Sequence, residues 1–138
     1  MRKLAEIVRH PSPVIMPATA TVKDACCAMR DRSVGSVLVV EADGGLIGIF
    51  TGRDAVHRVL AEGKSAARTR LHQVMTPAPR TIAADRPAIE ALRLMEDVGC
   101  RHLPIVREGR LVGVISRYDF NGVEIDRLDE EIGLWEHL

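Results

Sequence analysis

The stretch Gly-Ile-Phe-Thr-Gly-Arg-Asp at residues 48–54 returns in altered form as Gly-Val-Ile-Ser-Arg-Tyr-Asp at residues 113–119. Upstream of these stretches, residues 13–40 match residues 79–106 at a constant spacing of 66, without a gap. One residue is then lost in a Gly-containing turn, so that the spacing downstream is 65. An internal repeat decides the architecture before any local pattern does. We therefore predict two similar halves, in which a site made by one half has a counterpart in the other.

Both halves carry the same order of predicted elements: a short strand, a helix, two strands of a hairpin, and a second helix. The first repeat, about 8–64, is expected to hold strands over 14–16, 36–41 and 46–51, and helices from about 21 and over about 52–61. The second repeat, about 70–125, is expected to hold strands over 80–82, 102–106 and 111–116, a helix opening near Pro87, and a closing C-terminal helix over about 117–137. This order predicts an α/β (α+β) fold of two β-α-β-β-α units.

Chain length favours one domain over residues 1–138. A domain of this size buries roughly two-thirds of its unfolded surface, whereas a half of about 65 residues is marginal alone. We therefore expect the halves to share a core and to be related by pseudo-twofold symmetry. With 46% hydrophobic and only 3% aromatic residues, that core has to be built mainly from aliphatic side chains.

Charge and cysteine usage exclude several classes of function. The 19 basic and 19 acidic residues give a formal net charge of zero without a basic stripe, which argues against nucleic acid as a partner. No apolar run reaches the roughly 20 residues of a membrane span, and the first residues lack the apolar stretch of a signal peptide. Cys26, Cys27 and Cys100 show neither a disulfide-framework nor a CxxC spacing. We expect a cytoplasmic protein with ordinary core thiols.

The pattern Gly-x-x-Thr/Ser-x-x-Asp ends the hairpin of each repeat, as Gly48, Thr51 and Asp54 in the first. In a functional interpretation, the glycine lets a ligand approach the backbone. The hydroxyl and the carboxylate share one face of the first helical turn, and a carboxylate accepts two hydrogen bonds, as the diol of a ribose requires. The pattern is therefore compatible with a nucleoside ligand.

The same pattern is equally compatible with plain helix capping. A Ser or Thr followed three residues later by an acid is also a capping box, which needs no ligand. A duplicated fold also duplicates its helix caps, so the second copy of the pattern does not favour ligand binding over capping. Asp is shorter than the Glu or Gln that capping boxes prefer, and a cap does not require the preceding glycine. These residues alone leave both interpretations open.

The paired stretches resemble tandem CBS domains, named after cystathionine β-synthase, over roughly residues 8–125. The segments that carry the resemblance are Val-Gly-Ser-Val-Leu-Val-Val and Arg-His-Leu-Pro-Ile-Val together with the two corner motifs. The resemblance implies two halves packed sheet against sheet, with two clefts between the repeats. It also implies an adenosine-containing ligand (AMP, ADP, ATP or S-adenosylmethionine), association into homodimers, and regulation of another protein that the sequence does not identify.

Site residues follow from the resemblance position by position. Asp54 and Asp119 match the acid that binds ribose, and Thr51 and Ser116 match the hydroxyl that contacts ribose or phosphate. The backbone of the first strands, around Ile15 and Thr81, matches the part that reads the adenine edge. Arg53, Arg117 and His102 are expected phosphate neighbours. Tyr118 stands where the first repeat has Arg53, which predicts a less cationic second site.

Neither a metal site nor a catalytic site is predicted. The histidines are scattered without ligand spacing, and no Ser/His/Asp or Cys/His constellation is present in the sequence. The leading hypothesis is thus a non-catalytic sensor without a catalytic cofactor, and the alternative is a ligand-free structural module that acts through dimerisation. At the C-terminal end, Ile125, Leu128, Ile132 and Trp135 fall on one helical face, which covers either the chain's own core or another chain.

Overall fold

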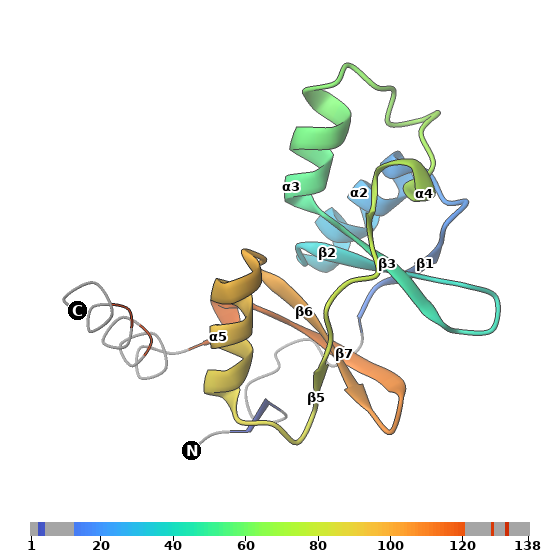
Figure 1. Cartoon of the computed structure of the whole chain (residues 1–138). Coiled ribbons are helices and arrows are strands. Elements are labelled where there is room, and N and C mark those ends of the chain that lie inside the picture. Colours follow the sequence, from blue (N-terminus) through green and yellow to red (C-terminus); the bar gives the residue numbers. More distant parts are fainter. Residues whose placement is uncertain (1–2, 5–12, 121–127, 129–131, 133–138) are drawn as a thin grey trace. The chain divides into compact units, whose positions relative to one another are not determined.

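The computed structural model describes residues 3–4, 13–120, 128 and 132 (Figure 1). The chain divides into two compact units, residues 13–79 and residues 1–12 with 80–138. We call these the first unit and the second unit and describe each by itself. The expected α/β architecture is confirmed, because each unit combines a small mixed sheet with helices.

The first unit contains a sheet with the strand order β1-β2-β3-β4. Strand β1 (Ile15–Pro17) runs parallel to β2 (Ser36–Val40), which forms an antiparallel hairpin with β3 (Leu46–Thr51). Residues 36–39 of β2 are all buried, as the run of β-branched residues predicted. The hairpin therefore forms the centre of this sheet.

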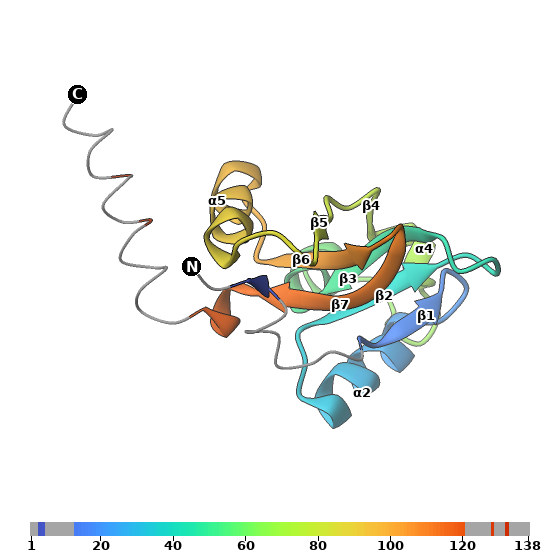
Figure 2. The same ribbon diagram turned by 90° about the horizontal axis from the view of Figure 1, so that it is seen from below.

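Helix α2 (Val22–Arg32) lies against the sheet of the first unit and has well-defined ends (Figure 2). The Thr21 side chain accepts a hydrogen bond from the Asp24 amide at 3.1 Å, which is the N-cap expected from the sequence. At the other end, Ser33 adopts a left-handed conformation with φ of 53°. The helix contributes Val22, Ala25 and Met29 to a core that also contains Val37, Val39, Phe50, Val59, Leu71 and Val74.

Three further helical segments belong to the first unit. The chain leaves β3 through α3 (Gly52–Asp54), which continues as the π-helical segment η1 (Ala55–Leu60). A short helix, α4 (Leu71–Val74), follows and leads into β4 (Thr76–Pro77), which pairs antiparallel with β3. Neither α4 nor β4 was predicted from the sequence.

The second unit contains a sheet with the order β5-β6-β7. Strand β5 (Ile82–Ala83) runs parallel to β6 (His102–Arg107), which forms a hairpin with β7 (Arg110–Ser116). Glu108 and Gly109 link these strands with φ of 51° and 76°. Positive φ at both positions is typical of the tight two-residue turn that the sequence indicated. Helix α5 (Ala88–Val98) lies against this sheet (Figure 2).

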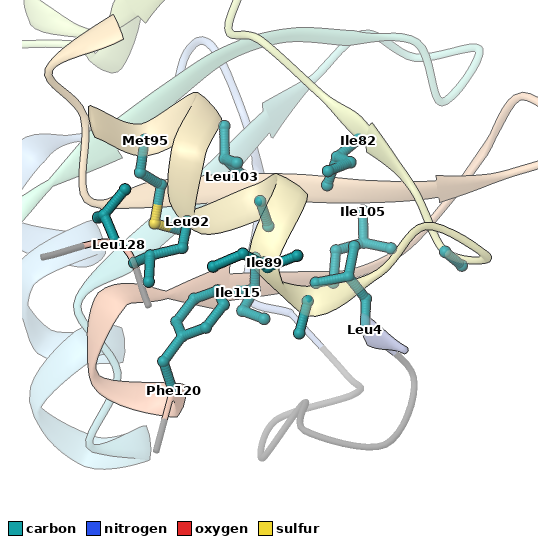
Figure 3. Close-up of a cluster of buried hydrophobic side chains, with 13 residues drawn as sticks. Leu4, Ile82, Ile89, Leu92, Met95, Leu103, Ile105, Ile115, Phe120 and Leu128 are labelled. Carbon is teal, nitrogen blue, oxygen red and sulfur yellow. The ribbon is translucent and has the colours of Figure 1, made fainter. Parts of the chain in front are cut away.

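The core of the second unit is aliphatic, apart from one phenylalanine (Figure 3). Leu92 and Met95 of α5 pack with Leu103 and Ile115 of the hairpin, and Leu4 joins them from the N-terminal end of the chain. Leu4 is completely buried. The second unit thus recruits a residue that precedes the whole first repeat in sequence.

The closing helix differs from the prediction. The chain forms one 3₁₀ turn, η2 (Arg117–Asp119), and Phe120 is then extended with φ of −84° and ψ of 144°. A continuous helix from about residue 117 is therefore wrong. Leu128 and Ile132, four residues apart, pack against the core of the second unit, whereas Ile125 and Trp135 lie outside the described residues. That part of the apolar face covers the chain's own core.

Candidate functional site

The first strand-to-helix corner is a complete capping box. Thr51 ends β3 in an extended conformation, and its hydroxyl accepts a hydrogen bond from the Asp54 amide at 3.2 Å. In return, the Thr51 amide donates to Asp54 Oδ2 at 3.0 Å. The capping interpretation of the motif is thus confirmed at this corner. A ligand role for Thr51 and Asp54 would be additional to their role in the cap.

Asp54 has further partners that capping does not require. The Thr51 hydroxyl lies 3.2 Å from Oδ2, and the Thr76 hydroxyl lies 3.3 Å from Oδ1 and 3.5 Å from Oδ2. The Arg58 guanidinium faces the same carboxylate, with Nε 3.5 Å from Oδ1. Asp54 is only 8% exposed. A nearly buried carboxylate needs such partners, because an unpaired buried charge is costly.

Arg58 also ties the corner to the end of α4. Its Nη1 donates to the backbone oxygen of Met75 at 2.9 Å and lies 3.5 Å from that of Val74. Since Arg58 lies on the π-helical segment η1, one side chain spans the carboxylate of Asp54 and the carbonyls that precede β4. Neither Arg58 nor Thr76 was predicted as a site residue from the sequence. The four-residue spacing from Asp54 to Arg58 was an available signal for an ion pair.

Gly48 has a different role from the one predicted. A Cβ at this position would collide with the sulfur of Met75 and lie 3.0 Å from its Cγ. Gly48 also pairs with Pro77 of β4. The space in front of this glycine is therefore occupied by the protein's own Met75, and the expectation that the glycine admits a ligand here is wrong.

The second corner repeats the central hydrogen bond in a more open setting. The Ser116 amide donates to Asp119 Oδ2 at 2.7 Å. Asp119 is half-buried, and Tyr118 beside it is 73% exposed. Arg117 forms an ion pair with Glu96 of α5, with Nη1 and Oε2 3.5 Å apart. This predicted phosphate neighbour is therefore engaged with an acid.

The other predicted site residues lie on or beside the sheets. Ile15 on β1 is 50% exposed, and Thr81, which directly precedes β5, is exposed as well. Arg53 is exposed on α3. His102 begins β6 and is the cross-strand partner of Ser116, so the structure brings these two residues together. Cross-strand pairing at that end of the hairpin places an imidazole beside the second corner.

The thiols of Cys26 and Cys100 have raised pKa values. Burial raises the pKa of the Cys26 thiol, with a smaller contribution from neighbouring Cys27, and burial likewise raises the pKa of the Cys100 thiol. A raised pKa disfavours the reactive thiolate.

Within the described residues, no group of three or more His, Cys, Asp or Glu side chains could hold a metal ion, and no helix is long and apolar enough to cross a membrane.

Comparison with known proteins decides the family. A family model for the CBS domain matches the chain twice, at residues 4–61 and 71–123. The chain belongs to the CBS-domain family. The resemblance drawn from the corner motifs is thereby confirmed, and the two matches follow the internal repeat.

Curated relatives share moderate identity with the chain. The CBS domain-containing protein CBSCBSPB1 of Arabidopsis thaliana is 32% identical over 109 residues, which cover 79% of this chain and 20% of the relative. The uncharacterized protein MK0525 of Methanopyrus kandleri is 34% identical over 118 residues, which cover 83% of this chain and 60% of that protein. The chain thus spans only part of the length of these relatives.

Two solved structures show the same fold with bound ligands. The CBS domain protein PAE2072 from Pyrobaculum aerophilum, complexed with AMP, has a TM-score of 0.82 and 24% identity, covering 94% of this chain and 99% of that one. The CBS domain pair of MJ0100, in complex with 5′-methylthioadenosine and S-adenosyl-L-methionine, has a TM-score of 0.77 and 23% identity, covering 92% and 98%. At these identities the likeness is one of fold.

Proposed function

We propose that the chain is a non-catalytic regulatory module that binds an adenosine-containing ligand, such as AMP, ADP, ATP or S-adenosylmethionine. The observation that carries this proposal is the pairing of a hydroxyl residue and a carboxylate at the strand-to-helix corner of both repeats in a CBS-domain chain. Solved proteins with this fold hold AMP, or methylthioadenosine and S-adenosylmethionine, which supports the same class of ligand here.

In this proposal each repeat contributes the same set of roles. Asp54 and Asp119 accept hydrogen bonds from ribose hydroxyls, and Thr51 and Ser116 contact ribose or phosphate. The backbone around Ile15 and Thr81, both exposed residues, reads the edge of the adenine. Carboxylates are suited to the diol because an ionised carboxylate only accepts hydrogen bonds and has two oxygens to do so.

Phosphate binding in the proposal falls to the cations near the corners, Arg53, Arg117 and His102. Arg53 is exposed, whereas Arg117 is already paired with Glu96. A phosphate on Arg117 would have to compete with that acid, so we expect the first corner to favour a phosphorylated ligand more strongly than the second.

The proposed module acts as a homodimer on a regulated protein partner. Val56 and Leu60 are 53% and 71% exposed on η1, four residues apart on one side of the helix. Exposed aliphatic side chains on one helical face are typical of association surfaces. Light scattering at high micromolar concentration should give twice the 15.2 kDa mass of the chain, and a monomer there would contradict the dimer.

Calorimetry with a nucleotide panel tests the ligand. We expect Asp54→Asn and Asp119→Asn each to lower the affinity for AMP at its own site by roughly ten- to a hundredfold, because a charge-assisted hydrogen bond contributes about 1.5–3 kcal/mol. Asn keeps one acceptor oxygen for the capping box, so Asp119→Asn should change the melting temperature of the ligand-free protein little, whereas Asp54→Asn also loses the ion pair with Arg58 and should lower it. If no nucleotide binds the wild-type chain, or if both variants bind it as tightly as the wild type, the proposed sites are wrong. The ligand-free dimerisation module is then the better explanation.

A further inference from the structure

The segment Leu71–Pro77, which we call the connecting segment, is bound to the first unit along its whole length. The Leu71 amide donates to the Ala20 carbonyl at 2.9 Å, and the His72 amide donates to the Ala18 carbonyl at 3.1 Å. Strand β4 then pairs with β3, and the Ala78 amide donates to the Ile47 carbonyl at 3.0 Å. Beyond Pro79 the chain enters the second unit at Arg80. The connecting segment is thus the last part of the first unit before the chain leaves it.

The connecting segment meets Asp54 through a single side chain. Thr76 is the β4 residue whose hydroxyl reaches both carboxylate oxygens, at 3.3 and 3.5 Å. Arg58 reinforces the contact from η1, because it faces Asp54 Oδ1 and donates to the Met75 carbonyl next to Thr76. The polar cluster of Asp54, Arg58 and Thr76 therefore joins the corner motif to the connecting segment.

The acceptor positions of Asp54 are nearly filled in this state. A carboxylate offers about four lone-pair positions. The Thr51 amide, the Thr51 hydroxyl and the Thr76 hydroxyl already use Asp54, and the Arg58 charge lies alongside. The Thr51 amide contact is 3.0 Å, and both hydroxyl donors, Thr51 at 3.2 Å and Thr76 at 3.3 and 3.5 Å, lie beyond the usual 2.7–2.8 Å of a hydroxyl donor. Thr51 also forms the cap, whereas Thr76 belongs to β4 and takes no part in it. Thr76 is therefore the donor that another hydroxyl can replace without breaking the cap.

We propose that Asp54 is a latch for the connecting segment and that Thr76 is a specificity-determining residue, whose hydroxyl competes with a ligand diol for this carboxylate. Binding at the first corner then releases the hydroxyl of Thr76 and loosens β4. The competition rests on the proposed function, whereas the latch does not. Only Ala78 and Pro79 separate the connecting segment from Arg80 of the second unit, so the exchange changes the contacts of the chain just before it enters the second unit.

Thr76→Val tests the proposal, because it keeps the branched shape and removes the hydroxyl. Thr19→Val makes the same atomic change at an exposed position, and Thr76→Ser restores a hydroxyl at the latch. In the ligand-free protein, hydrogen exchange of the Ala78 amide should be roughly two- to tenfold faster in T76V than in T19V, as expected for the loss of one net hydrogen bond. T76S should exchange like the wild type. Equal exchange in T76V and T19V overturns the latch.

Calorimetry with AMP in an Asp119→Asn background tests the competition. T76V should bind AMP at the first corner roughly two- to tenfold more tightly than T19V, since the ligand no longer has to displace the hydroxyl. Equal or weaker binding by T76V, with binding by the wild type intact, overturns the competition alone. Absence of AMP binding in every variant overturns the proposed function and the competition together, while the exchange measurement still decides the latch.

Discussion

In the first corner, Asp54 is 8% exposed and meets Thr51, Thr76 and Arg58, whereas in the second corner Asp119 is half-buried beside an exposed Tyr118. Both corners keep the hydrogen bond from the hydroxyl residue's amide to the aspartate, at 3.0 and 2.7 Å. Duplication has therefore preserved the local cap, while the two carboxylates differ in their exposure.

The two repeats also differ in sequence at the positions that match residues around Asp54. At the spacing of the repeat, His10 stands in the place of Thr76 and Val123 in the place of Arg58, and both lie outside the described residues. Tyr118 likewise replaces Arg53. Similar corner motifs are thus accompanied by different residue types at matching positions of the two repeats. A repeated motif therefore predicts a repeated cap, whereas the partners of the aspartate have to be established for each corner.

The largest expected effect concerns the leucines that each unit recruits from outside its main repeat. Leu71 is completely buried in the first unit and Leu4 in the second. We expect Leu71→Ala and Leu4→Ala each to lower the free energy of unfolding by about 2–5 kcal/mol, because each leaves a cavity. Urea denaturation measures both, with Val98→Ala, a 44% exposed position, as the control. A negligible loss for Leu4→Ala would show that the two units are not built alike.

The next effect separates the two aspartates in the ligand-free protein. Asp54→Ala leaves the Thr76 hydroxyl and the Arg58 charge without their partner in a nearly buried place, so we expect a loss of about 1–3 kcal/mol. Asp119→Ala should cost about 0.5–2 kcal/mol, as for loss of a cap at a partly exposed site. Thermal unfolding of both variants measures the difference. A larger loss for Asp119→Ala would contradict the contrast between the corners.

A comparable effect tests the role of Gly48. We expect Gly48→Ala to lower the free energy of unfolding by about 1–3 kcal/mol, since the new methyl group would overpack against Met75. Met75→Ala in the same chain should remove most of that penalty. A double-mutant cycle by urea denaturation measures the coupling. Independent, additive effects would mean that Met75 does not set the requirement for glycine.

The sequence predicted the regular elements well and the irregular ones poorly. The strand over 46–51 and the helix following Thr21 matched, because β-branched runs, glycine turns and caps act locally. Helix α4 and strand β4, with four and two residues, are too short to give a periodic signal. Both depend on contacts with distant parts of the first unit, such as Ile49 opposite Thr76. The break at Phe120 was likewise not predicted from a local sequence pattern.

Only those contacts of the candidate site that join residues close in sequence could be predicted. Thr51 and Asp54 are three residues apart, so their cap could be read from spacing. Thr76 lies 22 residues from Asp54, and only the pairing of β4 with β3 brings the two together. The meaning of Gly48 was also misjudged, because Met75 approaches it only in the folded chain. The ligand roles of the predicted residues stay predictions.

The smallest expected effect is the contribution of one thiol in each unit to the pH dependence of the unfolding free energy. Burial raises the pKa of Cys26 in the first unit and of Cys100 in the second from an ordinary value near 9.0. A raised pKa in the folded state means that folding favours the protonated thiol. The stability it contributes is fully present below the unfolded pKa and is lost as the pH rises through the folded one. Unfolding free energy should therefore fall between pH 8 and pH 11, and Cys26→Ala and Cys100→Ala should each flatten that fall slightly. Urea midpoints across this range measure the slopes, and since every other titrating group stays in place, slopes identical to the wild type would show that the thiols contribute nothing.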